Sequence, residues 1–83
     1  MNSTIRDVLA KFGQLPVSVD TLADDADLYA AGLSSFASVQ LMLGLEEAFE
    51  IEFPDSMLNR KSFASIAAIE TTVKAILDGK EAA

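Results

Sequence analysis

Residues 34–55 read SSFASVQLMLGLEEAFEIEFPD, and this stretch decides the fold. Its large apolar side chains recur three and four residues apart, as on one face of an α-helix. The members of that face are Leu41, Met42, Leu45 and Phe49, with Ser38 beside them. Either Ser34 or Ser35 can cap the start of this helix, and Pro54 biases the residue before it away from helical angles. The pattern predicts a helix from Ser34 or Ser35 to about Phe49.

A second stretch with helical spacing precedes it, from about Ser3 to Phe12. Its apolar stripe consists of Ile5, Val8, Leu9 and Phe12. We expect Asn2 or Ser3 to cap this helix and Gly13 to end it.

The last part of the chain predicts a short helical turn from Asp55 to about Arg60 and then a third long helix. That helix should start near Ser62 or Ser65 and stop at Gly79. Its apolar stripe consists of Ile66, Ile69, Val73, Ile76 and Leu77. The long connection over residues 14–34 should be pinned to the core by its own apolar side chains, and a connection of that length tends to be functional. These side chains are Leu22, Leu28, Tyr29 and Leu33.

Together these elements predict an all-α fold, a small antiparallel bundle of three main helices plus one short helix. The 83 residues form a single domain, 1–83, in which we expect residues 78–83 to fray. A chain of this length buries only about 60–65% of the surface exposed by its unfolded form, so it has room for one thin core.

The charge distribution limits the class of partner. The chain has 13 acidic and six basic residues, a net charge of −7, and no Lys or Arg between Phe12 and Asn59. Such a surface repels nucleic-acid backbones and favours a basic patch on a partner protein, although solubility alone also explains an acidic surface. No apolar run is long enough for a signal peptide or membrane span. We expect a cytoplasmic monomer that binds neither nucleic acid nor membrane.

Most catalytic and metal chemistry is excluded by composition. The chain has no Cys and no His, which removes disulfides, zinc sites and a histidine base. A calcium loop starting at Asp20 would need a carboxylate twelve places along, where Ala31 stands. The adjacent Glu46 and Glu47 are best read as a solvated helix face. We expect no catalytic residue and no metal ligand.

The two serines at the helix start need another explanation. A nucleophilic serine requires a base within hydrogen-bond reach, and none is available in this stretch. A serine there can simply cap the helix. Alternatively, the free N–H groups and the positive dipole end of the helix tolerate a phosphate, so the serine can be a substrate for modification by another enzyme.

The stretch resembles the acyl carrier protein family, and the resemblance covers nearly the whole chain. The matching residues are Ser35-Phe36-Ala37-Ser38-Val39-Gln40-Leu41, then Glu46-Glu47, Phe49 and Ile51-Glu52-Phe53-Pro54-Asp55. The resemblance implies that Ser35 carries a covalent 4'-phosphopantetheine, transferred from coenzyme A by a phosphopantetheinyl transferase. Its thiol would hold an acyl or aminoacyl group as a thioester for partner enzymes. A register starting at Ser34 would place Ser35 where the family has an apolar residue.

Departures from the family pattern point to a subgroup. Ser34 stands where the family commonly has Asp, and Ala37 and Gln40 replace acids. The segment FPDSMLNRKSFASIAAI is similar to bacterial carriers that accept an amino acid from a ligase related to seryl-tRNA synthetases. The implied partners are a loading ligase and downstream acyl-using enzymes. The alternative is an acidic, non-catalytic protein-interaction module in which Ser35 is only a helix cap.

The helix that follows Ser35 also predicts a docking surface. On a helical wheel the core-facing stripe turns Phe36, Val39, Gln40, Leu43 and Glu47 toward the opposite half. Three of these are apolar and close to Ser35, which suggests a partner contact ringed by Glu46, Glu47 and Glu50. Some of them could instead cover the loop or the short helix.

Overall fold

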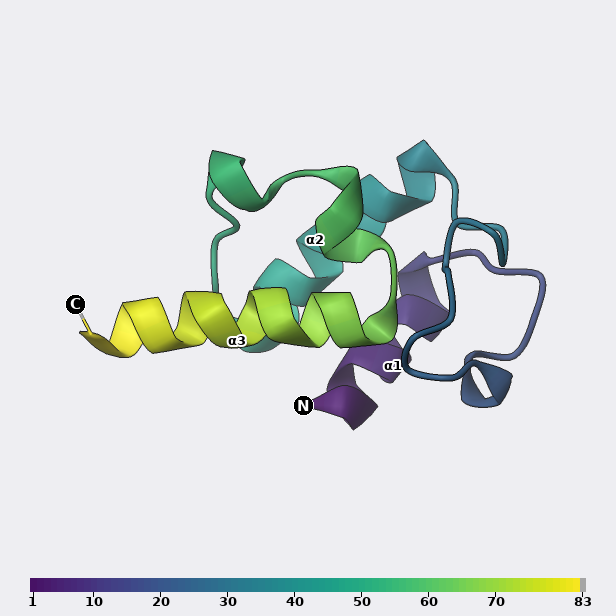
Figure 1. Ribbon diagram of the computed structural model, residues 1–83, viewed down its shortest axis with the longest axis horizontal. Helices are drawn as coiled ribbons and strands as arrows, with labels where there is room; N and C mark the ends of the chain where they lie inside the picture. Colours follow the sequence, from purple (N-terminus) through teal and green to yellow (C-terminus); the bar gives the residue numbers. More distant parts are fainter. Residues whose placement is uncertain (83) are drawn as a thin grey trace.

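The computed structural model describes residues 1–82, with side chains as far as Gly79. It contains three α-helices, α1 (Asn2–Phe12), α2 (Ser35–Phe49) and α3 (Ile66–Ala82). Three 3₁₀ turns lie between them: η1 (Val19–Thr21), η2 (Asp55–Met57) and η3 (Arg60–Phe63). No strand occurs within residues 1–82, and the all-α prediction is confirmed (Figure 1). None of the described helices has the length and apolar character needed to cross a membrane.

Three details of the predicted elements are wrong. The expected short helix is two separate 3₁₀ turns, because Leu58 and Asn59 between them leave helical angles. Helix α3 does not stop at Gly79 but continues to Ala82. Gly79 lacks the positive φ that often accompanies a helix stop; among the described glycines only Gly32 has one, at 119°. The expected caps Asn2 and Ser3 both lie inside α1, whose N-cap is Met1 without a side-chain bond. Ala83, the last residue of the segment expected to fray, lies outside the described residues.

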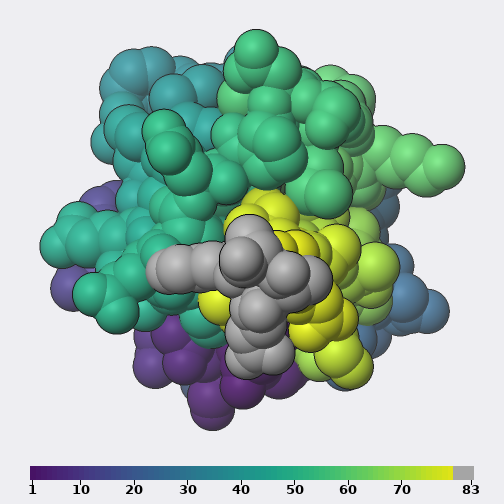
Figure 2. Space-filling view, turned by 90° about the vertical axis from the view of Figure 1, so that its left-hand side faces the viewer, coloured from purple at the N-terminus to yellow at the C-terminus, as the bar shows by residue number. Residues whose placement is uncertain are grey.

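The core forms where the three helices meet. Helix α1 packs against both α2 and α3, and viewed end-on the surface passes from purple α1 to yellow α3 to the green segment after α2 (Figure 2). The large side chains buried completely are Ile5, Leu9, Leu28, Leu41, Leu45, Ile66, Ile69 and Val73. They come from all three predicted stripes and from the long connection, which confirms that the stripes face the core. Five stripe members are only partly buried against it: Phe12, Met42, Phe49, Ile76 and Leu77.

The buried face of α2 is rotated slightly from the expected one. Ala37 and Gly44 join Leu41 and Leu45 inside, whereas Met42 is only partly buried. The sequence pattern missed both residues because neither has a large apolar side chain. Gly44 is required by close helix packing: a Cβ there would lie 2.6 Å from the Phe12 ring and 2.9 Å from Val8.

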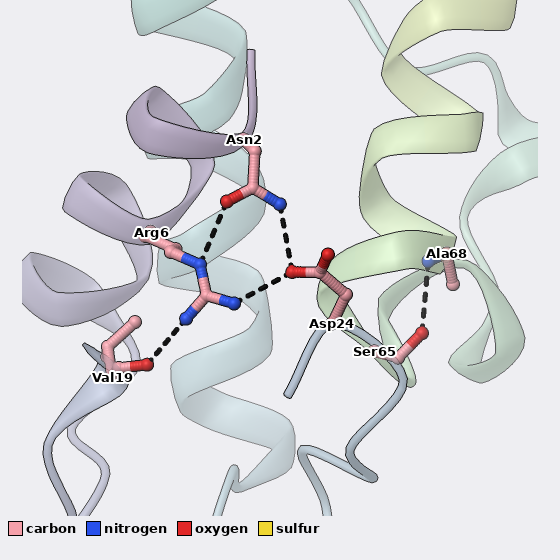
Figure 3. Close-up of polar contacts among 6 residues, drawn as sticks. All are labelled: Asn2, Arg6, Val19, Asp24, Ser65 and Ala68. Atoms are coloured by element: carbon pink, nitrogen blue, oxygen red, sulfur yellow. Dashed lines mark hydrogen bonds and ion pairs between the residues drawn. The ribbon is translucent and has the colours of Figure 1, made fainter. Parts of the chain in front are cut away.

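Arg6 ties the long connection to α1 (Figure 3). Its guanidinium donates to the Val19 carbonyl oxygen at 2.7 Å and to the Asp24 carboxylate at 2.7 Å, and its Nε donates to the Asn2 side-chain oxygen at 2.9 Å. Asn2 in turn donates to Asp24 at 3.0 Å. Asn2 therefore organises the connection, which explains why it does not cap the helix.

The middle of the connection is tied to the segment at the start of α3. The Leu28 N–H donates to the Ala64 carbonyl oxygen and the Ala67 N–H to the Asp24 carbonyl oxygen, both at 2.8 Å. Ser65 accepts from the Ala68 N–H at 3.0 Å, as expected of a cap (Figure 3). Bonds to α1 and to the start of α3 therefore hold the connection between Val19 and Leu28.

We predict opposite effects on stability for two glycine substitutions in helices. Helix propensity alone makes Gly→Ala favourable by up to about 1 kcal/mol. At Gly44 the added methyl must displace Phe12 and Val8, so Gly44→Ala should lower the free energy of unfolding by about 1–3 kcal/mol. At Gly79 nothing lies within 4 Å, so Gly79→Ala should be neutral or stabilising. Urea unfolding of both variants provides the measurement, and a stabilised Gly44→Ala would contradict this packing.

A pH effect should follow from the Arg6 contacts. Hydrogen bonds from Arg6 and Asn2 hold the pKa of the Asp24 carboxyl below its ordinary value of 3.8. A lowered folded-state pKa stabilises the protein above the ordinary pKa, and this contribution is lost as the pH falls through the folded-state pKa. Asp24→Asn should therefore make the loss of stability below about pH 4 shallower. Arg6→Gln should likewise make the fall in the free energy of unfolding below about pH 4 shallower. If both variants lose stability with pH as steeply as the wild type, the effect is ruled out.

Candidate functional site

The two adjacent serines have different roles at the start of α2. Ser34 is the N-cap, and its hydroxyl oxygen accepts a hydrogen bond from the Ala37 N–H at 3.0 Å. Ser35 is the first helical residue and is exposed. Within residues 1–79 its hydroxyl has no hydrogen-bond partner, although its carbonyl oxygen accepts from the Ser38 hydroxyl at 2.7 Å. The reading of Ser35 as only a cap is therefore wrong, because Ser34 does that work.

A pocket of about 460 Å³ opens beside the Ser35 side chain. Its walls come from the first turns of α2, from the long connection and from the segment that holds η2 and η3. The lining includes Ser35, Val39, Met42, Tyr29, Arg60 and Phe63. Its size is within the range of ligand pockets, and apolar walls with a few polar groups are typical of them.

Arg60 and Tyr29 form one wall of this pocket. The Arg60 guanidinium carbon lies 3.9 Å from the centre of the Tyr29 ring, a cation–π contact. The Tyr29 hydroxyl donates to the Arg60 carbonyl oxygen at 3.2 Å. Burial raises the pKa of this hydroxyl, an effect that the Arg60 charge opposes and the Asp27 charge reinforces. The side chain of Asp27 also accepts from the N–H groups of Tyr29 and Ala30, which fixes the turn that carries Tyr29.

The sequence pattern did not identify Arg60 as a site residue. A signal was nevertheless present, because Arg60 is the first basic residue after a stretch, Phe12 to Asn59, that contains no Lys or Arg. Only the fold brings it to the pocket beside Ser35. Together with the helix N-terminus, whose first turn contains no acidic residue, it makes this part of an acidic protein compatible with a phosphate ester.

The predicted docking residues of α2 divide into an exposed apolar group and a polar group. Phe36, Val39 and Leu43 have exposed fractions of 68%, 50% and 49%. They do not cover the core, and they lie on the helix that starts at Ser35. Their role in binding a partner stays a prediction.

The polar members of the predicted surface differ in their local contacts. Glu47 and Glu50 are exposed, and Gln40 is partly buried. The carboxylate of Glu46 accepts a hydrogen bond from the Phe53 N–H at 2.9 Å, so it helps to fix the segment after α2. Among the described residues, no cluster of three or more Asp, Glu, His or Cys side chains suited to a metal comes together.

Comparisons with known proteins agree with this geometry. A family model described as a phosphopantetheine attachment site matches residues 3–73. The aminoacyl carrier protein of Agrobacterium fabrum is 83% identical over the full length of both chains.

Two solved complexes contain a chain with a similar fold. In one, an engineered Bradyrhizobium japonicum glycine:[carrier protein] ligase is bound to a carrier protein from Agrobacterium tumefaciens and AMP. The matching chain is 82% identical, with a TM-score of 0.88 over 89% of this chain and 99% of that one. In the other, the Bradyrhizobium japonicum ligase is bound to its cognate carrier protein and an analogue of glycyl adenylate. That match is 31% identical, with a TM-score of 0.77 over 89% and 95% of the two chains.

Proposed function

Because this chain belongs to the family of proteins with a phosphopantetheine attachment site, we propose that Ser35 is the residue that carries the 4'-phosphopantetheine. The observation that carries the assignment is the contrast between the serines. Ser34 is occupied as the cap, and the Ser38 hydroxyl donates to a backbone carbonyl, whereas the Ser35 hydroxyl is exposed and unpaired within the described residues.

The protein is a carrier and not an enzyme, as its family and its 83% identical relative indicate. When bound, the covalent arm supplies a terminal thiol, which holds an acyl or aminoacyl group as a thioester. The residues around Ser35 fit this group. The start of α2 offers free N–H groups to a phosphate, and the neighbouring pocket has apolar walls along which an arm can lie.

We propose that the cargo is a small amino acid, with glycine as the first candidate. The support comes from the name of the 83% identical relative and from the ligase complexes of similar chains. The loading partner would be a glycine:[carrier protein] ligase, which activates the amino acid before it is transferred to the thiol.

We further propose that a separate phosphopantetheinyl transferase attaches the arm and that the carrier acts as a cytoplasmic monomer. The described residues provide no histidine or cysteine for self-modification. The apolar stripes of all three helices are covered within one chain, so a second copy is not required to complete the core.

The docking surface that we propose for these enzymes consists of Phe36, Val39 and Leu43 with the polar residues Gln40, Glu46, Glu47 and Glu50. An exposed apolar group beside the modified residue is suited to a partner contact, and the surrounding acids would attract a basic partner. The apolar centre should govern the lifetime of the complex and the acids its rate of formation.

The attachment site can be tested by intact mass after incubation with coenzyme A and a phosphopantetheinyl transferase. Ser35→Ala should gain no phosphopantetheine and should melt like the wild type, because its hydroxyl makes no internal bond. Ser34→Ala should be modified normally but lose about 0.5–2 kcal/mol of stability with its cap. Detection of the group on Ser34 or Ser38 by peptide mass spectrometry would show the assignment to be wrong.

The docking surface can be tested by the kinetics of glycine loading with the ligase and ATP. Leu43→Asp should lower the loading efficiency about tenfold or more, which corresponds to about 1.4 kcal/mol of binding energy. Glu47→Lys should mainly slow association and weaken its salt dependence. Val17→Asp is a matched control, because Val17 is 45% exposed and lies outside α2. With folding verified by circular dichroism, wild-type loading by Leu43→Asp would refute the surface.

A further inference from the structure

We propose that Arg60, held against the Tyr29 ring, binds the phosphate of the prosthetic arm and directs the arm into the pocket beside Ser35. The proposal rests on the assignment of Ser35 as the attachment residue. It adds a phosphate-binding pair contributed by η3 and by the long connection, two segments outside the helix that carries the serine.

The position and free donors of Arg60 are the first support. Ser35 and Arg60 line the same pocket, so a phosphate esterified to the serine would lie in a space that Arg60 borders. Within residues 1–79 that guanidinium forms no hydrogen bond and no ion pair. A guanidinium has five N–H donors arranged to bind two phosphate oxygens at once, and the cation–π contact to the ring leaves those donors available.

The surrounding charges are the second support. The acid next to this wall, Asp27, accepts the N–H groups of Tyr29 and Ala30 at one carboxylate oxygen and forms no ion pair with Arg60. The described ion pair of the chain joins Arg6 to Asp24 and does not involve Arg60. A phosphodiester keeps one negative charge at neutral pH. In a chain of net charge −7, Arg60 is the basic side chain placed in this pocket to neutralise it.

Tyr29 has a positioning role in this arrangement. Its ring lies against the guanidinium, and its hydroxyl bonds to the Arg60 carbonyl oxygen, so both ends of the arginine are restrained before the phosphate arrives. Pre-organisation of this kind reduces the ordering cost of binding. The adjacent Lys61 is exposed and does not line the pocket, which makes it a matched control for charge.

The test compares the ³¹P resonance of the modified protein in its folded state with that of the same protein unfolded in urea. The ³¹P chemical shift of the folded wild type should differ clearly from that of the unfolded protein, and this difference is the offset compared below. Arg60→Gln should lose at least half of this offset, Arg60→Lys should lose less, and Lys61→Gln should retain it. Tyr29→Leu should lose part of the offset although Arg60 is present. The Arg60 and Lys61 variants should fold because both residues are exposed, and circular dichroism verifies the folding of all four variants.

Tyrosine emission provides a second readout. Tyr29 is the single tyrosine and the chain has no tryptophan, so its fluorescence reports on the pocket wall. Attachment of the arm should change this emission in the wild type and in Lys61→Gln, but much less in Arg60→Gln.

The outcomes separate the two proposals. If mass spectrometry finds no phosphopantetheine on Ser35, the attachment assignment fails. If Ser35 is modified but the ³¹P offset of Arg60→Gln equals that of the wild type, the attachment stands and the role of Arg60 is overturned. A folded wild type without any offset would overturn it equally.

Discussion

The burial of one face of α2 is the constraint on which the rest of the structure depends. Ala37, Leu41, Gly44 and Leu45 are covered by the other helices, and the close approach at Gly44 leaves little freedom to rotate α2 about its axis. With that face inside, the start of the helix and its opposite side must lie at the surface. The burial of this one face of α2 therefore places the serine, its neighbouring apolar residues and the pocket at the surface.

The long connection between α1 and α2 is ordered by polar contacts as much as by apolar ones. Arg6 holds its first half through two hydrogen bonds, to Val19 and Asp24, and Asp27 organises the turn that carries Tyr29. Leu28 and Leu33 are buried on either side of that turn. This combination explains how a connection with so little regular structure can form a defined wall of the site.

The charge near the start of α2 is positive, whereas the surface of the protein as a whole is strongly acidic. The surface as a whole attracts basic partners, and nine of its 13 acids fall within residues 20–55. The start of α2 differs, because it has the positive end of a helix dipole and Arg60 close by. An anionic group can thus be accommodated locally without changing the long-range field that guides association.

The sequence by itself determined the helix stripes, the exposed serine and the family, because these depend on periodicity and on residue types at fixed spacing. Ile5, Leu41 and Ile69 could be assigned to the core from spacing alone, since a helix places residues three and four apart on one face. Only the tertiary structure decided which serine caps α2, because the two candidates are adjacent and the chain entry angle selects Ser34. The same holds for Asn2, drawn into contacts with Arg6 and Asp24, and for Gly44, which is buried because helix packing leaves no room for a side chain. The meeting of Tyr29 with Arg60, 31 residues apart, likewise depends on how the connection folds back over η3, since helical spacing relates only residues within a few turns of one another.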